Sequence, residues 1–181
     1  GGGSIRIPAS CCGLFGFKPS RGRISMAPQG EGWGGYTVLH AVTRSVRDSA
    51  AILDVSCEPV AGDPYYLARP ETPFREDVNR NPGKLRIGLV TGNLNGTAQD
   101  PQCTAAVRET AKLCESLGHN VEVTVVPPTI KDLLETAMVI IGTTVAVNLQ
   151  READRRGRAI GDDEIEPLSR LVWERSKALT G

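Results

Sequence analysis

The sequence has few of the residues that build metal or redox centres. Its 181 residues include two histidines, and the five cysteines are odd in number and contain no C-x-x-C pair. They are Cys11, Cys12, Cys57, Cys103 and Cys114. This pattern is typical neither of a zinc site nor of a disulfide framework. We therefore expect reduced thiols and no zinc site.

The sequence also lacks net charge and long apolar segments. Lysine plus arginine number 21 and aspartate plus glutamate number 21, so the composition does not indicate binding to nucleic acid or to an anionic membrane. No apolar run approaches the roughly 20 residues of a membrane span, and no signal peptide precedes the first residue. These absences predict a cytoplasmic protein with neither a nucleic-acid nor a membrane partner. They leave open whether it is a homo-oligomer.

What is present is an alternation of strand and helix patterns. Residues 84–90 and 120–126 alternate in polarity and are rich in β-branched residues, which predicts two strands. Between them, residues 101–117 carry apolar side chains at helical spacing, with an aspartate and a proline at the start and a glycine at the end. This order predicts a βαβ unit with parallel strands and an α/β fold.

Other segments give weaker signals. Ser45, with Asp48 three residues on, predicts the start of a helix. Residues 64–82 indicate a surface connection. An apolar helix is expected from residue 129 to about residue 149, and the charged tract at residues 151–158 is interpreted as a solvated helix face.

The first four residues, Gly1, Gly2, Gly3 and Ser4, have the composition of an oxyanion-binding loop. Consecutive glycines permit positive φ and allow amide N–H groups to converge on one point. If a short helix follows at about residues 5–12, its N-terminus adds positive potential beside the Ser4 hydroxyl. Acyl transfer needs this arrangement of a nucleophile and nearby donors. On these four residues alone, a flexible Gly/Ser turn is the favoured interpretation.

The continuation is more specific. The run GGSIRIPA at residues 2–9 and the run CGLFGFKPSRGR at residues 12–23 resemble the amidase signature family closely. The resemblance continues through TRSVRD at residues 43–48 and GDP at residues 62–64. Within the family, residues 1–64 are most similar to the branch that hydrolyses the cyclic dimer of 6-aminohexanoate.

The resemblance implies a mechanism and a fold. It implies that Ser4 is the acylated nucleophile and that the amides of Gly1, Gly2, Gly3 and Ser4 form the oxyanion hole. The family's base is a lysine, and a serine in a cis peptide relays the proton; both precede the Gly-Gly-Ser motif. We therefore expect residues 1–181 to be an interior fragment of one amidase domain, a mixed β-sheet flanked by helices in an α/β/α arrangement. The fragment alone is expected to be inactive, whereas its parent is expected to hydrolyse an uncharged linear or cyclic amide. The resemblance implies that this reaction requires no metal or organic cofactor.

Few residues within the chain are candidates for a base. Lys18 lies between Phe17 and Pro19, a pattern that favours a strand-end lysine over a buried neutral one. His119 follows a helix-ending glycine and is interpreted as a cap residue. His40 lies in an apolar stretch and is either a core residue or, together with Trp33 and Tyr36, part of the lining of a pocket. A Ser4, His40 and aspartate triad stays formally open, although the family resemblance argues against it.

Two other classes of function remain. The Gly88–Gly96 loop follows a strand and precedes a helix, which is the context of a nucleotide-binding turn. It has neither a G-x-G-x-x-G nor a G-K-[ST] pattern, and Asp100 at the helix start would repel a phosphate. A noncatalytic interaction fragment is the third alternative, in which nothing depends on Ser4.

Overall fold

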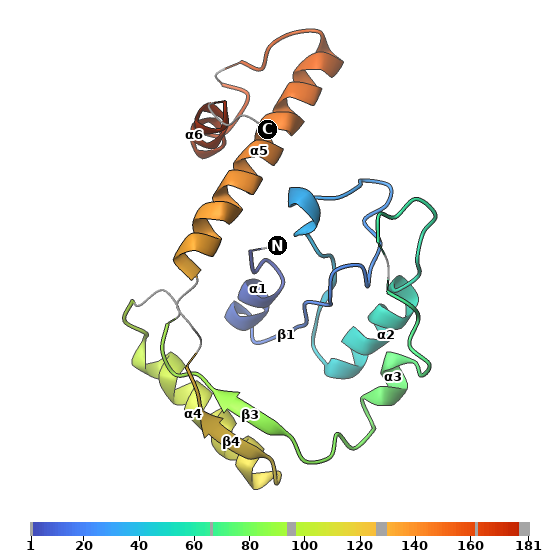
Figure 1. The fold of residues 1–181 in the computed structure, drawn as a ribbon, viewed down its shortest axis with the longest axis vertical. Helices are drawn as coiled ribbons and strands as arrows, with labels where there is room; N and C mark the ends of the chain where they lie inside the picture. The colour runs from blue at the N-terminus through green and yellow to red at the C-terminus, as the bar shows by residue number, and fades with distance from the viewer. Residues whose placement is uncertain (1, 66, 94–96, 126–129, 162, 178–181) are drawn as a thin grey trace. The chain divides into compact units, whose positions relative to one another are not determined.

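A computed structural model describes residues 2–65, 67–93, 97–125, 130–161 and 163–177 (Figure 1). The chain divides into two compact units. The first comprises Gly1–Arg80 and Ile140–Gly181, and the second comprises Asn81–Val139.

The N-terminal part of the first unit is a short helix packed on a two-stranded ribbon. Helix α1 (Arg6–Cys11) is followed by strand β1 (Phe15–Gly16), which pairs antiparallel with strand β2 (Val42–Thr43). Ala9, on α1, is almost completely buried. Its carbonyl accepts a hydrogen bond of 2.8 Å from the amide of Leu14. The helix is therefore held directly against the ribbon that follows it.

Helix α2 (Val46–Ser56) begins where the sequence predicts. The Ser45 hydroxyl accepts a hydrogen bond of 3.1 Å from the amide of Asp48, which confirms the expected cap. Asp54, near the other end of α2, accepts hydrogen bonds from the first amides of helix α3 (Phe74–Asp77). The segment expected to be a surface connection thus contains a one-turn helix that docks on α2.

The C-terminal part of the chain is helical. Helix α5 (Ile130–Arg156) is longer than the predicted segment and includes most of the charged tract. Residue 129, its expected first residue, lies outside the described residues. Helix α6 (Pro167–Ser176) approaches α5 closely at Gly142, where the Ser176 hydroxyl occupies the space of a β-carbon.

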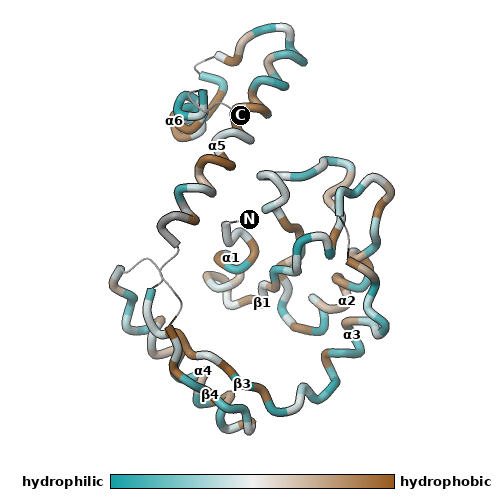
Figure 2. The backbone as a smooth tube through the Cα atoms, in the orientation of Figure 1, coloured by the Kyte–Doolittle hydropathy of each residue, from teal (hydrophilic) through white to brown (hydrophobic). Residues whose placement is uncertain are grey.

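The second unit contains the predicted βαβ arrangement. Strands β3 (Arg86–Leu89) and β4 (Asn120–Val123) pair in parallel and are connected by helix α4 (Pro101–Ser116). Figure 2 shows hydrophobic residues concentrated on β3. Both strands are shorter than their sequence patterns predict, but the type and order of all three elements are confirmed.

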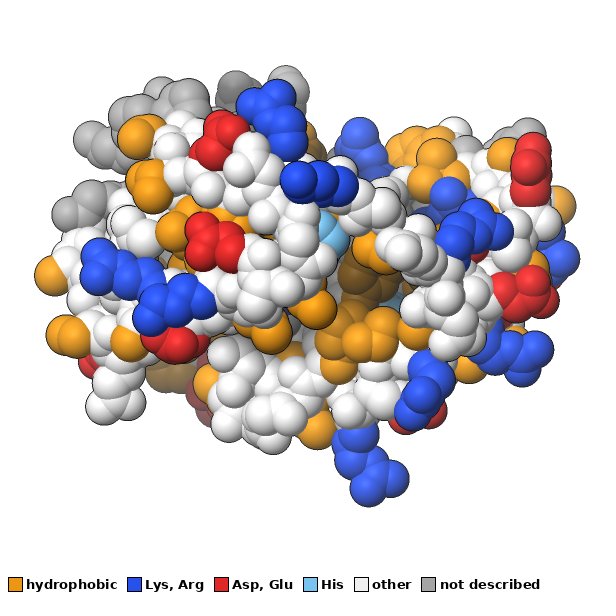
Figure 3. Space-filling view, turned by 90° about the horizontal axis from the view of Figure 1, so that it is seen from below, with side chains coloured by type: hydrophobic (Ala, Val, Ile, Leu, Met, Phe, Trp, Pro, Cys, Tyr) orange, Lys and Arg blue, Asp and Glu red, His pale blue; other side chains and the backbone are white. Residues whose placement is uncertain are grey.

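The described surface is mixed in polarity. In Figure 3, basic and acidic side chains are scattered with hydrophobic side chains between them. Many large apolar residues are exposed, including Val55 on α2, whose exposed fraction is 79%. Among the described residues, no helix combines the length and the apolar character needed to cross a bilayer.

Candidate active site

Ser4 lies in the turn that leads into helix α1. It is exposed, and the turn is closed by a hydrogen bond of 2.8 Å from the amide of Ile7 to the carbonyl of Gly3. Gly3 has φ of +126°, and a β-carbon there would lie 2.7 Å from Cδ1 of Ile7. The positive φ therefore favours glycine at position 3, whereas the end of the flexible Ile7 side chain could move aside.

The start of α1 carries no side-chain cap. Its N-cap residue, Ile5, makes no side-chain hydrogen bond to the helix, whereas Ser45 caps α2 and Asp100 caps α4. Unpaired amides at a helix start carry partial positive charge and favour a nearby anion. In α1 the Ile7 amide already donates to the Gly3 carbonyl and Pro8 has no N–H, so an oxyanion site beside Ser4 stays a prediction. Gly1, one of the predicted oxyanion-hole residues, lies outside the described residues.

A small cavity, here called the Ser4 cavity, adjoins the nucleophile candidate. It is lined by residues 3–6 together with Lys18 and Val38, and its volume is about 10 Å³. A single water needs about that much space. The Lys18 ammonium donates a hydrogen bond of 2.8 Å to the Pro19 carbonyl, so this lysine lies near Ser4 while being anchored to its own chain neighbour.

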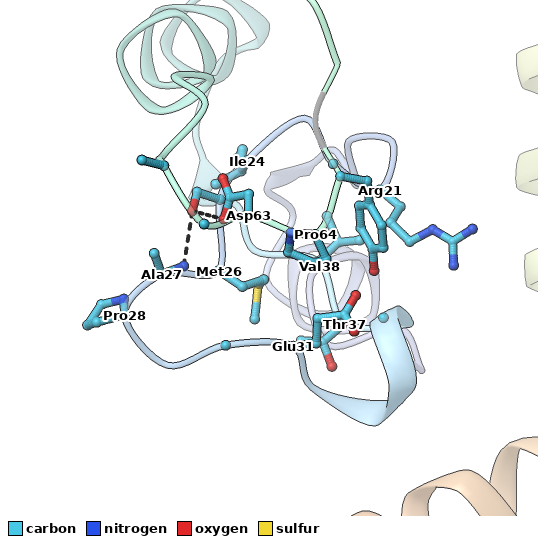
Figure 4. Close-up of a pocket in the computed structure, with 17 residues that line it drawn as sticks. Arg21, Ile24, Met26, Ala27, Pro28, Glu31, Thr37, Val38, Asp63 and Pro64 are labelled. Atoms are coloured by element: carbon cyan, nitrogen blue, oxygen red, sulfur yellow. Dashed lines mark hydrogen bonds between the residues drawn. The ribbon is translucent and has the colours of Figure 1, made fainter.

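A larger cavity, here called the Asp63 cavity, is formed by residues 21–38 and 61–65 (Figure 4). Its volume is about 190 Å³. Val38 belongs to the wall of this cavity and also to the wall of the Ser4 cavity. The two cavities are therefore neighbours that share one side chain.

Trp33, Tyr36 and His40, which the sequence predicts to line a pocket, are close in sequence to residues of the Asp63 cavity. Gly35, Thr37 and Val38 contribute to its wall, whereas Trp33, Tyr36 and His40 do not. A role for those three residues in substrate binding stays a prediction.

The walls of the Asp63 cavity are joined by the Asp63 carboxylate. One carboxylate oxygen accepts a hydrogen bond of 2.7 Å from the Ser25 hydroxyl, and the other accepts one of 3.0 Å from the Val60 amide. The Ser25 hydroxyl in turn accepts a hydrogen bond from the Ala27 amide (Figure 4). A single acidic side chain thus fixes two segments that are 38 residues apart in the sequence.

Two aromatic rings and two charged side chains gather at the rim of this cavity. The Arg21 guanidinium lies 5.3 Å from the centre of the Tyr65 ring and 5.9 Å from that of Tyr36. A hydrogen bond to the Glu31 carboxylate raises the pKa of the Tyr65 hydroxyl. Tyr65 therefore contacts both charged side chains, Glu31 through a hydrogen bond and Arg21 through its ring.

His40 is engaged away from Ser4. Its Nε2 is 2.9 Å from the Ser49 hydroxyl on α2, and its ring packs edge-on against Phe17 with centroids 6.0 Å apart. Burial lowers the pKa of this imidazole, although a hydrogen bond to Ser49 opposes the shift. These contacts favour the interpretation of His40 as a core residue.

His119 has a structural contact in the second unit. Its Nδ1 accepts a hydrogen bond of 3.3 Å from the amide of Leu85, the residue before β3. The imidazole therefore joins the residues that precede the two parallel strands.

The helix that follows the loop considered for nucleotide binding is capped by an acidic side chain. The Asp100 carboxylate accepts a hydrogen bond of 2.7 Å from the Gln102 amide and so occupies the start of α4. Gly88 lies within β3, where a β-carbon would be 2.8 Å from Cγ2 of Thr124. Packing against Thr124 therefore explains the glycine at position 88. Residues 94–96 of the loop lie outside the described residues.

The cysteines are all free thiols, as expected from their spacing. Within the described ranges, histidine, cysteine, aspartate and glutamate side chains form no group of three that could hold a metal ion.

Sequence reasoning did not identify the Asp63 cavity. The Gly-Asp-Pro sequence at residues 62–64 indicates a family resemblance, and no local pattern connects it with Ser25. Val38 carries no sequence signal either, since an apolar residue in a loop is compatible with many roles.

Comparison with known proteins identifies the family of the chain. The sequence model of the family described as "Amidase" matches residues 1–179. The chain therefore belongs to the amidase family.

Among its relatives are two 6-aminohexanoate-cyclic-dimer hydrolases, from Pseudomonas sp. (strain NK87) and Paenarthrobacter ureafaciens. Each is 36% identical over 99% of this chain and 37% of its own length. A solved structure of 6-aminohexanoate cyclic dimer hydrolase complexed with substrate matches with a TM-score of 0.91 and 35% identity, over 99% of this chain and 38% of that one. The α/β fold is thus that of the corresponding part of an amidase signature enzyme. The chain spans less than two fifths of the length of these relatives.

Proposed function

We propose that the protein containing this chain hydrolyses a carboxylic amide through an acyl-enzyme on Ser4. The observation that carries the proposal is the placement of an exposed serine after a glycine turn and before an uncapped helix start. Membership of the amidase family supports the reaction class.

The steps follow from this placement. The Ser4 hydroxyl oxygen attacks the amide carbonyl as its proton passes to a base. Amides of the glycine turn, Gly1, Gly2, Gly3 and Ser4, stabilise the oxyanion, an interaction for which one donor is typically worth about 3 to 4 kcal/mol. The C–N bond then breaks, and the amine leaves with a proton. Water attacks the ester, which releases the carboxylic acid and restores Ser4.

The base is assigned to residues outside this chain. A serine hydroxyl is a weak nucleophile until a neighbouring base removes its proton. The family resemblance assigns that role to a lysine and a cis-peptide serine that precede the Gly-Gly-Ser motif. We therefore treat residues 1–181 as the part of the amidase domain that carries the nucleophile, inactive when isolated.

The substrate class is an uncharged linear or cyclic amide. The balanced composition and the similarity to cyclic-dimer hydrolases support this choice.

The test uses the complete protein and a panel of linear, cyclic and charged amides. Replacing Ser4 by alanine should lower kcat by about 10⁴-fold or more, as is typical when a nucleophile is removed. Ser10→Ala, which removes an exposed hydroxyl from the helix that follows Ser4, is the matched control and should retain turnover. Full activity of Ser4→Ala would refute the mechanism, and a strong preference for a charged amide would refute the substrate class.

A further inference from the structure

We propose that the Asp63 cavity binds the part of an amide substrate that extends beyond the scissile bond, with Val38 as the partition between this subsite and Ser4. The inference rests on the proposed function of Ser4 and adds a binding site and a specificity-determining residue to it.

The first argument is size. The Ser4 cavity, about 10 Å³, holds no more than about one water, whereas the Asp63 cavity measures about 190 Å³. A substrate chain of several atoms can enter only the second of these two spaces. Val38 contributes to the walls of both cavities, so the two spaces adjoin at this residue.

The second argument is the chemistry of the lining. Ile24, Met26 and Pro64 supply apolar surface to the wall, and Figure 4 shows the Met26 side chain extending along it. Ligand sites commonly combine such surface with a few placed polar groups. This surface suits an aliphatic chain.

The third argument concerns charge at the polar end. Glu31 is hydrogen bonded by the Tyr65 phenol, and Arg21 packs over the same ring. Arg21 and Glu31 are both exposed and carry opposite charges, so the rim favours neither sign of charge, whereas a neutral donor or acceptor can bond to either side chain. The cavity therefore favours an aliphatic chain that ends in an uncharged hydrogen-bonding group, such as a second amide.

The fourth argument is that the cavity is held open by its own contacts. The Ser25 hydroxyl and the Asp63 carboxylate join the two walls, and the Leu67 amide donates a hydrogen bond of 3.0 Å to the Gly22 carbonyl. At Gly35, where φ is +84°, a β-carbon would collide with the Tyr65 hydroxyl, so loop and ring fit closely. A site fixed in this way loses little entropy on binding.

The experiment compares two chromogenic amides in the complete protein. The short one is 4-nitroacetanilide, and the long one is the 4-nitroanilide of 6-acetamidohexanoic acid. The readout is the ratio of kcat/KM for the long substrate to that for the short one. Val38→Phe should lower this ratio about tenfold through KM of the long substrate, because the larger ring fills the passage. Val55→Phe, on the exposed face of α2, is the matched control and should leave the ratio unchanged.

A second variant covers the case in which Val38→Phe does not fold. Tyr65→Phe keeps the ring and removes the hydroxyl. It should lower the ratio roughly fivefold for the 6-acetamido substrate, and should have no such effect when a plain hexanoyl anilide replaces it.

The two proposals fail in different ways. If Ser4→Ala still releases 4-nitroaniline, the mechanism on Ser4 is wrong, and the subsite proposal falls with it. If Ser4→Ala is inactive but Val38→Phe and Tyr65→Phe leave the ratio unchanged, the subsite is wrong and the mechanism stands. An equal loss of kcat/KM on both substrates would leave the ratio unchanged and would likewise overturn the subsite proposal.

Discussion

The backbone of Gly16 lies directly against the side chain of Ala9. A β-carbon at position 16 would be 2.6 Å from Cβ of Ala9 and 2.8 Å from the carbonyl oxygen of Ile5. The ribbon that begins at Phe15 therefore fixes helix α1, and with it the turn that carries Ser4. The site is positioned by a contact between two of the smallest residues in the chain.

Replacing Gly16 by alanine should destabilise the chain and displace Ser4. The neighbouring atoms are a buried methyl group and a backbone carbonyl, which cannot rotate away, so we expect a loss of about 1 to 3 kcal/mol in the free energy of unfolding. Chemical denaturation of the purified chain measures it. Gly92→Ala, which meets no atom within 4 Å, is the control. An equal effect of the two substitutions would contradict the packing argument.

The stability of the first unit should decrease as His40 becomes protonated. Burial lowers the pKa of His40 below its ordinary value of 6.5 in the folded chain. As the pH falls, the unfolded chain therefore takes up the proton at a higher pH than the folded chain does. Stability is then fully present above about pH 6.5 and is lost as the pH falls toward the folded-state pKa. Thermal unfolding between pH 7.5 and about pH 4.5 tests this expectation.

His40→Gln should unfold with a weaker pH dependence than the original chain over that range. His119→Gln removes the other imidazole and serves as the control. An unchanged pH dependence in His40→Gln would show that His40 has no part in it.

The Glu164 carboxylate should stabilise the turn after helix α5 at neutral pH and lose this effect at acidic pH. Hydrogen bonds from Arg158 and from the Gly161 amide lower the pKa of this carboxyl from 4.5 to about 2. The folded chain therefore holds the carboxylate ionised where the unfolded chain does not, and its contribution is lost as the pH falls from about 4.5 toward 2. Because the group is solvated, we expect only a small change in melting temperature.

The measurement is thermal unfolding of the original chain and of Glu164→Gln at several pH values. The two should differ at pH 7 and converge at acidic pH. Glu174→Gln, which removes a partner of Lys177 on α6, is the comparison for a single exposed ion pair. A difference that persists at the lowest pH would rule out the carboxylate as its source.

Much of the fold was predictable from local sequence signals. Asp100 and Pro101 mark the start of α4, Ser45 marks the start of α2, and the parallel pairing of β3 with β4 follows from the order of the patterns. These features depend on residues close together in the chain. Strand lengths were overestimated because an alternating pattern continues beyond the last paired residue.

The site was predictable only in part. Ser4 and its glycine turn lie within one short motif, and sequence alone directs attention to them. The contacts between Ser25 and Asp63, and between Glu31 and Tyr65, join distant segments. Short polar residues in loops occur for many reasons, so no single-sequence pattern predicts such pairs.

The carboxylate of Asp63 closes a loop of 38 positions. Closing a loop of that length has an entropic cost that grows with the logarithm of its length. A molecule held between the walls would contact both ends of this loop at once and would therefore oppose its opening. Occupancy of the cavity should then be detectable as slower amide hydrogen exchange at Val60 and Ala27, even in a chain that performs no chemistry.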